Sequence, residues 1–403
     1  MWKKMVALLF GLMLVATVPS FGRVAADSTS TQGASVTVIL VSDNEADGAL
    51  ARYLANVTGG AVVVTTKWGG VYDPNVTAEV MSYAPDMVII IGGPPDAVVE
   101  QYVDDLSELK ITVERWGGKN RYETNVKVVG NARAKLGLTF NGSAIIVPGN
   151  DTLALEQSLK LAVKSRGVLL FVNRTSNVSR VMLNLNIKAK KITLVATPVM
   201  NKTIMHIKKG LGSKDCNCTE IEVNVTAETA LKAINASEER IETAKEMLQN
   251  VTLVPQMEKL AEKMLKLADR ELARAKEAYN DGKYGMAYGQ AIAAKAHAEF
   301  VIRIASEQWS TRVRANQTVM ARVFLWRVER QIQAMEKAGI NVTELKALVD
   351  QLKTAVANGG DYDAIDSIIQ QIREKIFELY ARGKGKFREK MVFPAHRGGH
   401  GKP

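Results

Sequence analysis

The chain has 403 residues, with 53 Lys or Arg against 42 Asp or Glu, so its formal net charge is +11. Hydrophobic residues make up 47% and cysteines only 2 positions, which excludes a disordered chain, a collagen-like repeat and a small disulfide-stabilised protein. The length predicts two or three domains with packed cores. The charge is uneven, because residues 141–215 carry 12 basic and 3 acidic side chains whereas residues 27–140 carry 9 and 14.

Residues 1–26 have the three parts of a secretory signal peptide. Lys3 and Lys4 form a basic start, an apolar run follows from Met5 to Val18, and small residues stand at a cleavage site near Ala26. The apolar run of about 14 residues is too short to span a bilayer comfortably. The sequence therefore predicts an exported chain, with an uncleaved N-terminal anchor as the alternative.

Glycosylation motifs support export. Of 21 asparagines, 13 begin an Asn-x-Ser/Thr sequon, whereas independent placement would give about 2. Frequent Asn and Thr in turns would explain a few of them. We expect a heavily N-glycosylated surface protein that binds no nucleic acid. The predicted sites are Asn56, Asn75, Asn141, Asn150, Asn173, Asn177, Asn201, Asn217, Asn224, Asn235, Asn250, Asn316 and Asn341.

Residues 36–225 alternate short β-branched runs with helical patterns. The runs are nearly all apolar, as parallel strands covered on both faces should be. Equivalent runs recur 104 to 107 residues apart, so we predict two tandem parallel-sheet α/β modules, module 1 over 36–120 and module 2 over 121–225. The expected strands are 38–41, 61–65, 87–91, 111–113, 144–147, 168–172, 192–195 and 221–223.

The segment Arg115–Thr124, Arg-Trp-Gly-Gly-Lys-Asn-Arg-Tyr-Glu-Thr, resembles the signature of the cell wall-binding repeat 2 family. Residues 38–54 resemble the strand, loop and helix that open its module, and Ile89–Gly93 resembles its Ile-Gly-Gly step. Module 2 is degenerate, because it has Ala196–Pro198 in place of Gly-Gly and keeps only Glu228–Thr229 of the signature.

The resemblance implies a non-catalytic, exported prokaryotic protein that attaches to or forms part of the cell surface layer. More narrowly, it implies an archaeal source. The implied partner is an anionic envelope polymer or a surface-layer protein, and oligomers are compatible with it. Two alternatives are a helical surface scaffold that recruits a partner protein and an envelope glycan hydrolase. No nucleophile elbow, P-loop, dinucleotide fingerprint or His-Glu-x-x-His motif occurs, so no catalytic residue or cofactor is expected.

The signature residues have two possible roles. The guanidinium groups of Arg115 and Arg121 could bind a carboxylate or phosphate. Alternatively, they could connect one module to the next, because the motif lies at the boundary between the modules. The glycines permit a tight turn or a close approach of a ligand to the backbone. Glu123 and Thr124, at the end of the motif, are predicted to begin a helix. The candidate ligand-binding or module-interface residues are Gly92, Gly93, Arg115, Gly117, Gly118, Asn120, Arg121, Tyr122, Glu123 and Thr124.

Other polar residues give weaker signals. Cys216 and Cys218 could form a disulfide, with intermolecular pairing or two free thiols as alternatives. Asp43, Glu45 and Asp47 lack EF-hand spacing, so capping of the following helix is favoured over calcium binding. No metal ligands are expected.

The lysines of module 2 are spread over predicted helix faces. They form either an ordinary solvated surface or a salt-sensitive docking face for a polyanion. These lysines are Lys188, Lys190, Lys191, Lys202, Lys208, Lys209 and Lys214.

Residues 226–382 change to an Ala-, Glu-, Lys- and Leu-rich composition that predicts a helical bundle or hairpin domain, interpreted as a stalk or spacer. The basic, Gly-rich tail 383–403 is expected to be disordered, and either to contact a membrane surface or to act only as a solubilising end. The expected helices are 226–250, 255–281, 284–336 (continuous or broken near Trp309), 342–357 and 361–382.

Overall fold

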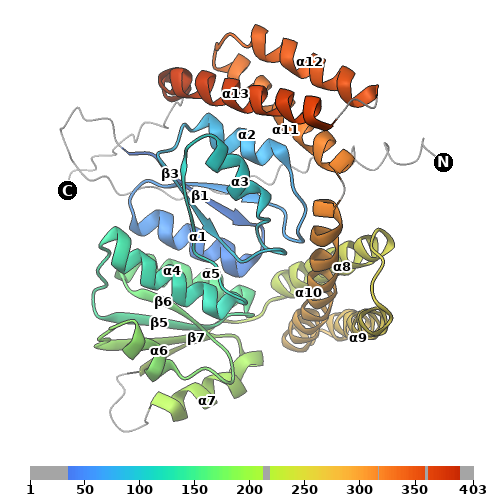
Figure 1. Cartoon of the computed structure of the whole chain (residues 1–403). Coiled ribbons are helices and arrows are strands. Elements are labelled where there is room, and N and C mark those ends of the chain that lie inside the picture. Colours follow the sequence, from blue (N-terminus) through green and yellow to red (C-terminus); the bar gives the residue numbers. More distant parts are fainter. Residues whose placement is uncertain (1–34, 212–217, 316, 359–361, 391–403) are drawn as a thin grey trace.

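The computed structural model describes residues 35–211, 218–315, 317–358 and 362–390, and the side chains of 309–321 are also outside the description. The predicted signal peptide, 1–26, lies outside the described residues. Two parallel sheets lie one above the other with helices between and outside them, and two groups of C-terminal helices pack against this body (Figure 1). The chain is therefore an α/β protein with added helices, as the sequence predicts.

The first sheet has the strand order β2-β1-β3-β4, with every neighbouring pair parallel. Val38 in β1 stands opposite Val62 in β2 and Val88 in β3. The central strands are apolar at Val38–Val41 and Met87–Ile91 because helices cover both faces of the sheet. The strands are β1 Thr37–Ser42, β2 Val62–Thr66, β3 Met87–Ile91 and β4 Thr112–Arg115.

The second sheet has the same order, β6-β5-β7-β8, and is again parallel. Only the last strand differs from its predicted place, 221–223. The edge strand β8 is largely exposed, so its residues do not form the apolar run that marks the other strands. The strands are β5 Ser143–Pro148, β6 Val168–Val172, β7 Lys191–Ala196 and β8 Cys218–Glu222.

Three helices lie between the sheets, and their apolar residues join the inner faces of both sheets in one core that includes Leu50, Trp116 and Leu155. The two modules therefore share a core. The inner helices are α1 Glu45–Val57, α4 Arg121–Leu136 and α5 Thr152–Ser165. The outer helices are α2 Pro74–Ser82 and α3 Gln101–Glu108 on module 1, and α6 Val178–Asn184 and α7 Asn201–Leu211 on module 2, where a 3-10 turn, η2 Pro198–Met200, precedes α7.

The helical half, predicted as a helical bundle or hairpin domain, forms two groups of helices. The helices α8 Ala227–Gln249, α9 Pro255–Asn280 and α10 Tyr284–Ala315 pack on one another through small residues such as Ala244, Ala268 and Ala291. Their core also contains Trp68 of module 1. The predicted segment 284–336 corresponds to α10, described up to Ala315, and α11, described from Gln317; residue 316 between them lies outside the described residues.

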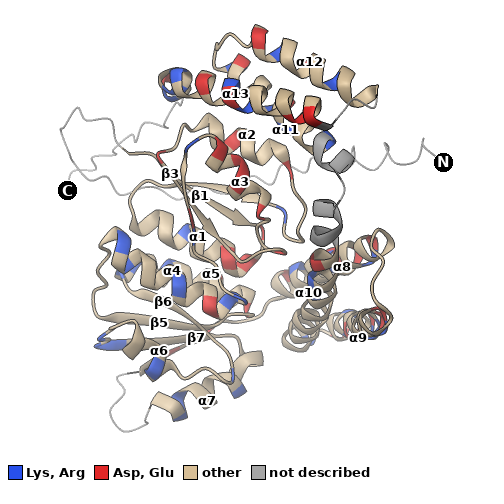
Figure 2. Cartoon of the chain, viewed as in Figure 1, with Lys and Arg blue, Asp and Glu red and all other residues tan. Residues whose placement is uncertain are grey.

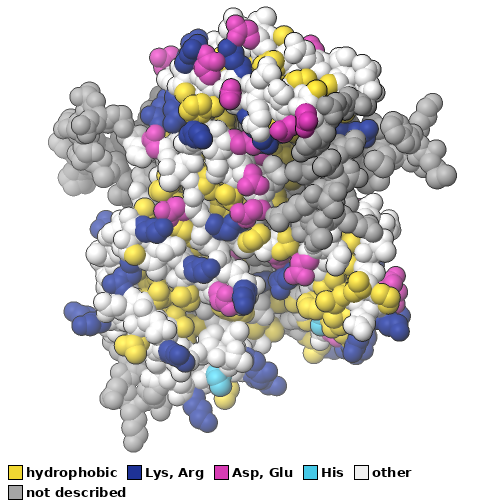
Figure 3. Space-filling model, in the orientation of Figure 1, with side chains coloured by type: hydrophobic (Ala, Val, Ile, Leu, Met, Phe, Trp, Pro, Cys, Tyr) yellow, Lys and Arg dark blue, Asp and Glu magenta, His cyan; other side chains and the backbone are white. Residues whose placement is uncertain are grey.

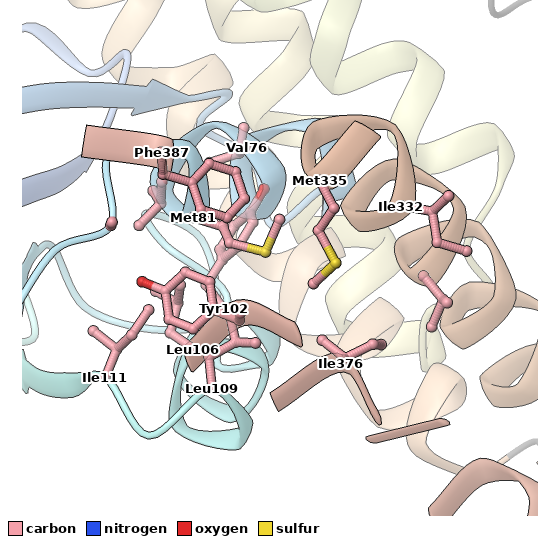
Figure 4. Packing of buried hydrophobic residues seen from close by; sticks show 14 of the residues in the cluster. Val76, Met81, Tyr102, Leu106, Leu109, Ile111, Ile332, Met335, Ile376 and Phe387 are labelled. Atoms are coloured by element: carbon pink, nitrogen blue, oxygen red, sulfur yellow. The ribbon is translucent and has the colours of Figure 1, made fainter. Parts of the chain in front are cut away.

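The second group covers the outer face of module 1. It consists of α11 Gln317–Lys337, α12 Thr343–Ala357 and α13 Tyr362–Lys390. Figure 4 shows Ile332, Met335 and Ile376 of this group in one apolar cluster with Met81 and Leu106 from the outer helices of module 1. These helices act as a cover because α11 and α13 bury apolar side chains against the module, while α12 packs on α11 and α13.

The last helix extends into the segment expected to be a disordered tail. Residues 383–390 belong to α13, and Phe387 is 3% exposed. Arg388 donates from Nη2 to the carbonyl oxygen of Ala84 at 3.0 Å and to Asp86 at 2.8 Å. These contacts offset the poor helix propensity of Gly383 and Gly385. The rest of the tail, 391–403, lies outside the described residues.

No helix among the described residues is both long and apolar enough to cross a membrane. The described part of the chain also contains no group of three or more His, Cys, Asp or Glu side chains placed to hold a metal ion. Cys218 begins β8, whereas Cys216 lies outside the described residues, so the predicted disulfide is not described.

Candidate functional site

The signature residues form the joint between two loops at the carboxyl ends of β3 and β4. A Cβ atom on Gly93 would overlap the carbonyl oxygen of Gly118, and one on Gly117 would overlap that of Gly92. Gly92 also has a φ of +118°, which L side chains rarely adopt. The glycines therefore serve backbone-to-backbone packing of these loops.

Arg115 lies at the end of β4 and holds the loop that follows β3. Its Nη1 donates to the carbonyl oxygens of Gly92 at 3.0 Å and Val98 at 2.9 Å, and its Nη2 donates to Glu100 at 3.1 Å. Burial lowers the pKa of Arg115, against the attraction of Glu100. The guanidinium is thus used by the protein's own carbonyl groups.

The start of α4 is stabilised by the polar residues of the signature. Asn120 caps the helix, since its Oδ1 accepts from the backbone N–H groups of Tyr122 at 3.1 Å and Glu123 at 3.0 Å. The Glu123 carboxylate accepts from the N–H of Lys119, and the Thr124 hydroxyl accepts from the N–H of Gly118. The bonds to Asn120 satisfy donors that the first turn of a helix leaves free, and those to Glu123 and Thr124 hold the loop that precedes it.

Arg121 connects the motif to module 2 and to α10. Its Nη1 donates to the carbonyl oxygen of Gly149 at 2.9 Å, and its Nη2 pairs with Glu299 at 3.0 Å. Burial acts to lower the pKa of Arg121, but the nearby Glu299 carboxylate outweighs it, so the pKa is raised. Tyr122 packs beside Gly149 in the shared core, where burial raises its pKa.

A charged network surrounds this arginine where α10 meets module 1. Lys295 pairs with Glu45 and lies 3.8 Å from Glu299, and Arg303 pairs with Asp96 at 3.0 Å. Because α10 contributes three of these side chains, it fixes the helical group to the strand ends of module 1. Capping of α1 comes from Asn44, which accepts from the N–H of Ala46, and not from the neighbouring acidic residues.

A buried carboxyl group lies inside this joint. Asp47 is 7% exposed and lines a small polar hollow with Arg121 and Arg303. Burial, with the nearby Asp96 and Glu299 carboxylates, raises the pKa of Asp47 to about 6, although Arg121 acts to lower it. The joint therefore contains one carboxyl group that titrates close to neutral pH.

Four of the participating side chains are not marked by the signature: Asn125, Lys295, Glu299 and Arg303. Asn125 in α4 bonds to the backbone of Leu169 and Phe171 on the free edge of β6, at 2.9 Å each. Lys295, Glu299 and Arg303 recur every four residues in an otherwise Ala-rich helix. That spacing is the signal by which one charged face of α10 could have been found.

Module 2 presents a different kind of site, exposed and basic. Lys188, Lys190, Lys191, Lys202 and Lys209 are exposed. In Figure 2 the ribbon around α6 and α7 is marked mostly by blue segments, and Figure 3 shows more dark blue than magenta over the same part of the surface.

One further lysine of this stretch has an acidic partner. Lys208 pairs with Glu220 of β8. Lys214 lies outside the described residues. The exposed lysines are thus concentrated around α6, α7 and the segment before β7.

The amino-acid sequence is 32% identical over 287 residues to the uncharacterized protein MJ0755 of Methanocaldococcus jannaschii, an alignment that covers 69% of this chain and 78% of that protein. The chain belongs to the same family as MJ0755. No family model matches the chain. The resemblance to cell wall-binding repeat 2 therefore rests on the motif residues, and the narrower expectation of an archaeal source stays unsupported.

Solved structures with partial similarity include two from Clostridium difficile. Cwp8 aligns with a TM-score of 0.39 and 21% identity over 50% of this chain and 33% of its own, and Cwp6 with a TM-score of 0.38 and 20% identity over 48% and 30%. The chain thus spans about a third of the length of either structure. A likeness of this size says nothing about function.

Proposed function

We propose that the protein is an exported, non-catalytic component of the cell envelope that attaches to an anionic envelope polymer through module 2. The observation that carries this proposal is a difference between the two outer faces. The outer helices of module 1 are covered by α11–α13, whereas α6 and α7, the corresponding helices of module 2, are exposed. That exposed face is basic.

The chemistry of the exposed face fits a polyanion. Arg180, Lys202 and Lys209 are exposed on its two helices, and they stand beside Leu183 and Met205, which are 77% and 67% exposed. A concentration of one sign of charge attracts an oppositely charged polymer, and salt weakens that attraction. Attachment through module 2 also agrees with the contacts of Arg115 and Arg121. Both guanidinium groups bond to other groups of the protein, so the signature is not the part that binds the polymer.

The surface location of the sequons supports exposure to an envelope environment. Asn150 and Asn173 are half-buried, and the other sequon asparagines that the structure describes are exposed. Asn217 and Asn316 lie outside the described residues. An acceptor asparagine must be reachable by the glycosylating enzyme, so this distribution is compatible with modification at each described site.

The alternative of a helical scaffold has less support. The core of α11 and α13 is shared with module 1, α12 packs on these two helices, and α8–α10 pack on one another. The apolar side chains left exposed on α9 and α10 include Met257, Met286 and Phe300. We therefore assign the helical half mainly to bracing the two α/β modules.

The test is sedimentation of the purified protein with isolated envelope over a series of salt concentrations. The triple variant R180Q/K202Q/K209Q is compared with K259Q/K263Q/K266Q, which removes the same charge from exposed positions of α9. We expect binding at low salt that salt weakens, a loss of about tenfold in affinity for the first variant, and little change for the second. Absence of binding at low salt, or equal losses in both variants, would contradict the proposal.

A further inference from the structure

A hollow of about 570 Å³ opens at the amino-terminal edge of the second sheet. It lies between the last turns of α4, the start of β5 and the loop that joins α6 to β7. Arg133, Phe140, Asn141, Lys188 and Lys190 are among the residues that line it. Its volume is within the roughly 300–1,000 Å³ of small-ligand sites.

The walls of this hollow are held in place by the fold. Arg133 donates from Nη1 to the carbonyl oxygens of Leu185 and Asn186, the latter at 2.9 Å, and so ties the loop after α6 to α4. On the other side, the carbonyl oxygen of Gly142 accepts from the N–H groups of Lys190 at 2.6 Å and Lys191 at 3.1 Å. A ligand would therefore meet a preformed site, which lowers the entropic cost of binding.

The charges in the hollow are of one sign. Its described lining includes three cationic side chains and no carboxylate. Arg133, Lys188 and Lys190 form no ion pair with any residue that the structure describes. Clustered cations without a counter-charge favour an anionic ligand, and the planar guanidinium fits a carboxylate or phosphate in particular.

The remaining lining narrows the chemistry of that ligand. Thr139 and Ser143 offer hydroxyl groups, and Phe140 offers an apolar ring. A free phosphate would use the cations and the hydroxyl donors but not the ring. A sugar that carries a carboxylate uses all three kinds of group, because its carboxylate pairs with the cations, its hydroxyls form hydrogen bonds, and the C–H face of its ring packs on an aromatic side chain.

We infer that this hollow binds a carboxylate-bearing sugar unit of the envelope polymer. The carboxylate lies against Arg133, Lys188 and Lys190, and the sugar ring lies beside Phe140. The inference rests on the proposed function, since it names which unit of the polymer is held and where. The basic face of α6 and α7 then adds a less specific attraction along the same polymer.

The test is isothermal titration of the full chain with a glucuronic acid disaccharide, a neutral glucose disaccharide and inorganic phosphate. The protein is produced in a host that does not glycosylate it, because Asn141 begins a sequon on the rim of the hollow. We expect the acidic disaccharide to bind, the neutral one not to bind, and phosphate to bind about tenfold more weakly than the acidic sugar.

Three variants locate the site. K188Q/K190Q is expected to weaken the acidic disaccharide about tenfold, and F140L to weaken it while the acidic specificity remains. The matched control K259Q/K263Q, with the same loss of charge on α9, should bind it as the unaltered chain does. Equal binding of the neutral sugar, phosphate binding as tight as the acidic sugar, or no effect of K188Q/K190Q would overturn the inference.

The two proposals fail in distinguishable ways. If the chain binds isolated envelope at low salt but not the acidic disaccharide, attachment stands and the assignment of this hollow is wrong. If it binds the disaccharide through Lys188 and Lys190 but not the envelope, the hollow stands as a sugar site, and both envelope attachment and the assignment of that sugar to the envelope polymer are wrong.

Discussion

Arg121 and Glu299 form an ion pair of 3.0 Å between the start of α4 and the middle of α10, 178 residues apart in the sequence. Their side chains are 23% and 8% exposed. The same guanidinium also donates to the carbonyl oxygen of Gly149. One side chain therefore joins the start of α4, the loop after β5 and the helical group.

The R121A variant should be markedly less stable. Removal of one partner leaves the Glu299 carboxylate buried without its main counter-charge, so we expect the free energy of unfolding to fall by roughly 3 kcal/mol. Urea denaturation followed by circular dichroism measures it. The control K232A removes a fully exposed pair with Glu228 and should leave stability almost unchanged. A similar decrease in the free energy of unfolding in both variants would show that the buried ion pair contributes no more than the exposed one.

Substitution of Gly117 by alanine should also destabilise the fold. The new Cβ would overlap the carbonyl group of Gly92, so one of the two loops must move, at a cost of at least about 2 kcal/mol. G285A is the matched change, because a Cβ at that position in α10 meets no atom within 4 Å. It should raise stability by up to about 1 kcal/mol. Thermal melting of both variants measures the contrast. A G117A variant with the melting temperature of the unaltered chain would contradict the prediction.

Asp47 should make stability fall as the pH rises. Its pKa is raised to about 6 in the folded chain from 3.8, so the folded state binds more protons between these values. The free energy of unfolding therefore decreases from about pH 4 to about pH 6 and then levels off, with a total on the order of 2–3 kcal/mol.

The D47N variant measures this contribution. It should lack that part of the pH dependence and exceed the unaltered chain in stability at pH 8, whereas D350N, at a 76% exposed position, should follow the unaltered chain. Denaturation at several pH values gives the difference curves. The charged groups that face Asp47 are Arg121, Asp96 and Glu299, and they are kept in both variants. Parallel curves for D47N and the unaltered chain would contradict the prediction.

The end of α13 should contribute to stability although its sequence resembles a flexible tail. F387A removes a buried ring from the cluster that joins α13 to module 1, so we expect a loss of about 3 kcal/mol. E389A, at an exposed position two residues further on, should have little effect. Hydrogen exchange of residues 383–390 would reveal the same difference. Fast exchange there in the unaltered chain would show that this segment is not held.

Most of the α/β architecture could be predicted from the sequence because its signals are local. Runs such as Val38–Val41 and Val168–Val172 are wholly apolar, and only strands covered on both faces have that pattern at that length. The helices of the second half were equally readable, since Asn280–Gly282 and Ala338–Gly339 supply clear breaks between periodic segments.

The grouping of those helices could not be predicted, because it depends on contacts between distant segments. Met335 and Ile376 show only that two helices have apolar faces, and not that module 1 is their partner. The end of α13 was missed for a related reason. Gly383 and Gly385 signal flexibility, while the contact between Gly383 and Ile340 that fixes them lies elsewhere in the chain.

The signature at Arg115–Thr124 is recognisable in the sequence, but the sequence does not decide whether its residues bind a ligand or connect the modules. Its residues indicate a joint as readily as a ligand site, and only the distances from Arg115 and Arg121 to carbonyl groups decide how they are used here. The hollow beside Arg133 gave no sequence signal, because its lining comes from three separate segments of module 2.

The covered outer face of module 1 and the bare outer face of module 2 lie at opposite ends of the molecule (Figure 1). Chains that bind a surface through the outer face of module 2 would all have the same orientation, with α11–α13 pointing away from that surface. The cell would then display one chemically uniform side of many identical molecules, and any later partner would meet α12 and α13 first.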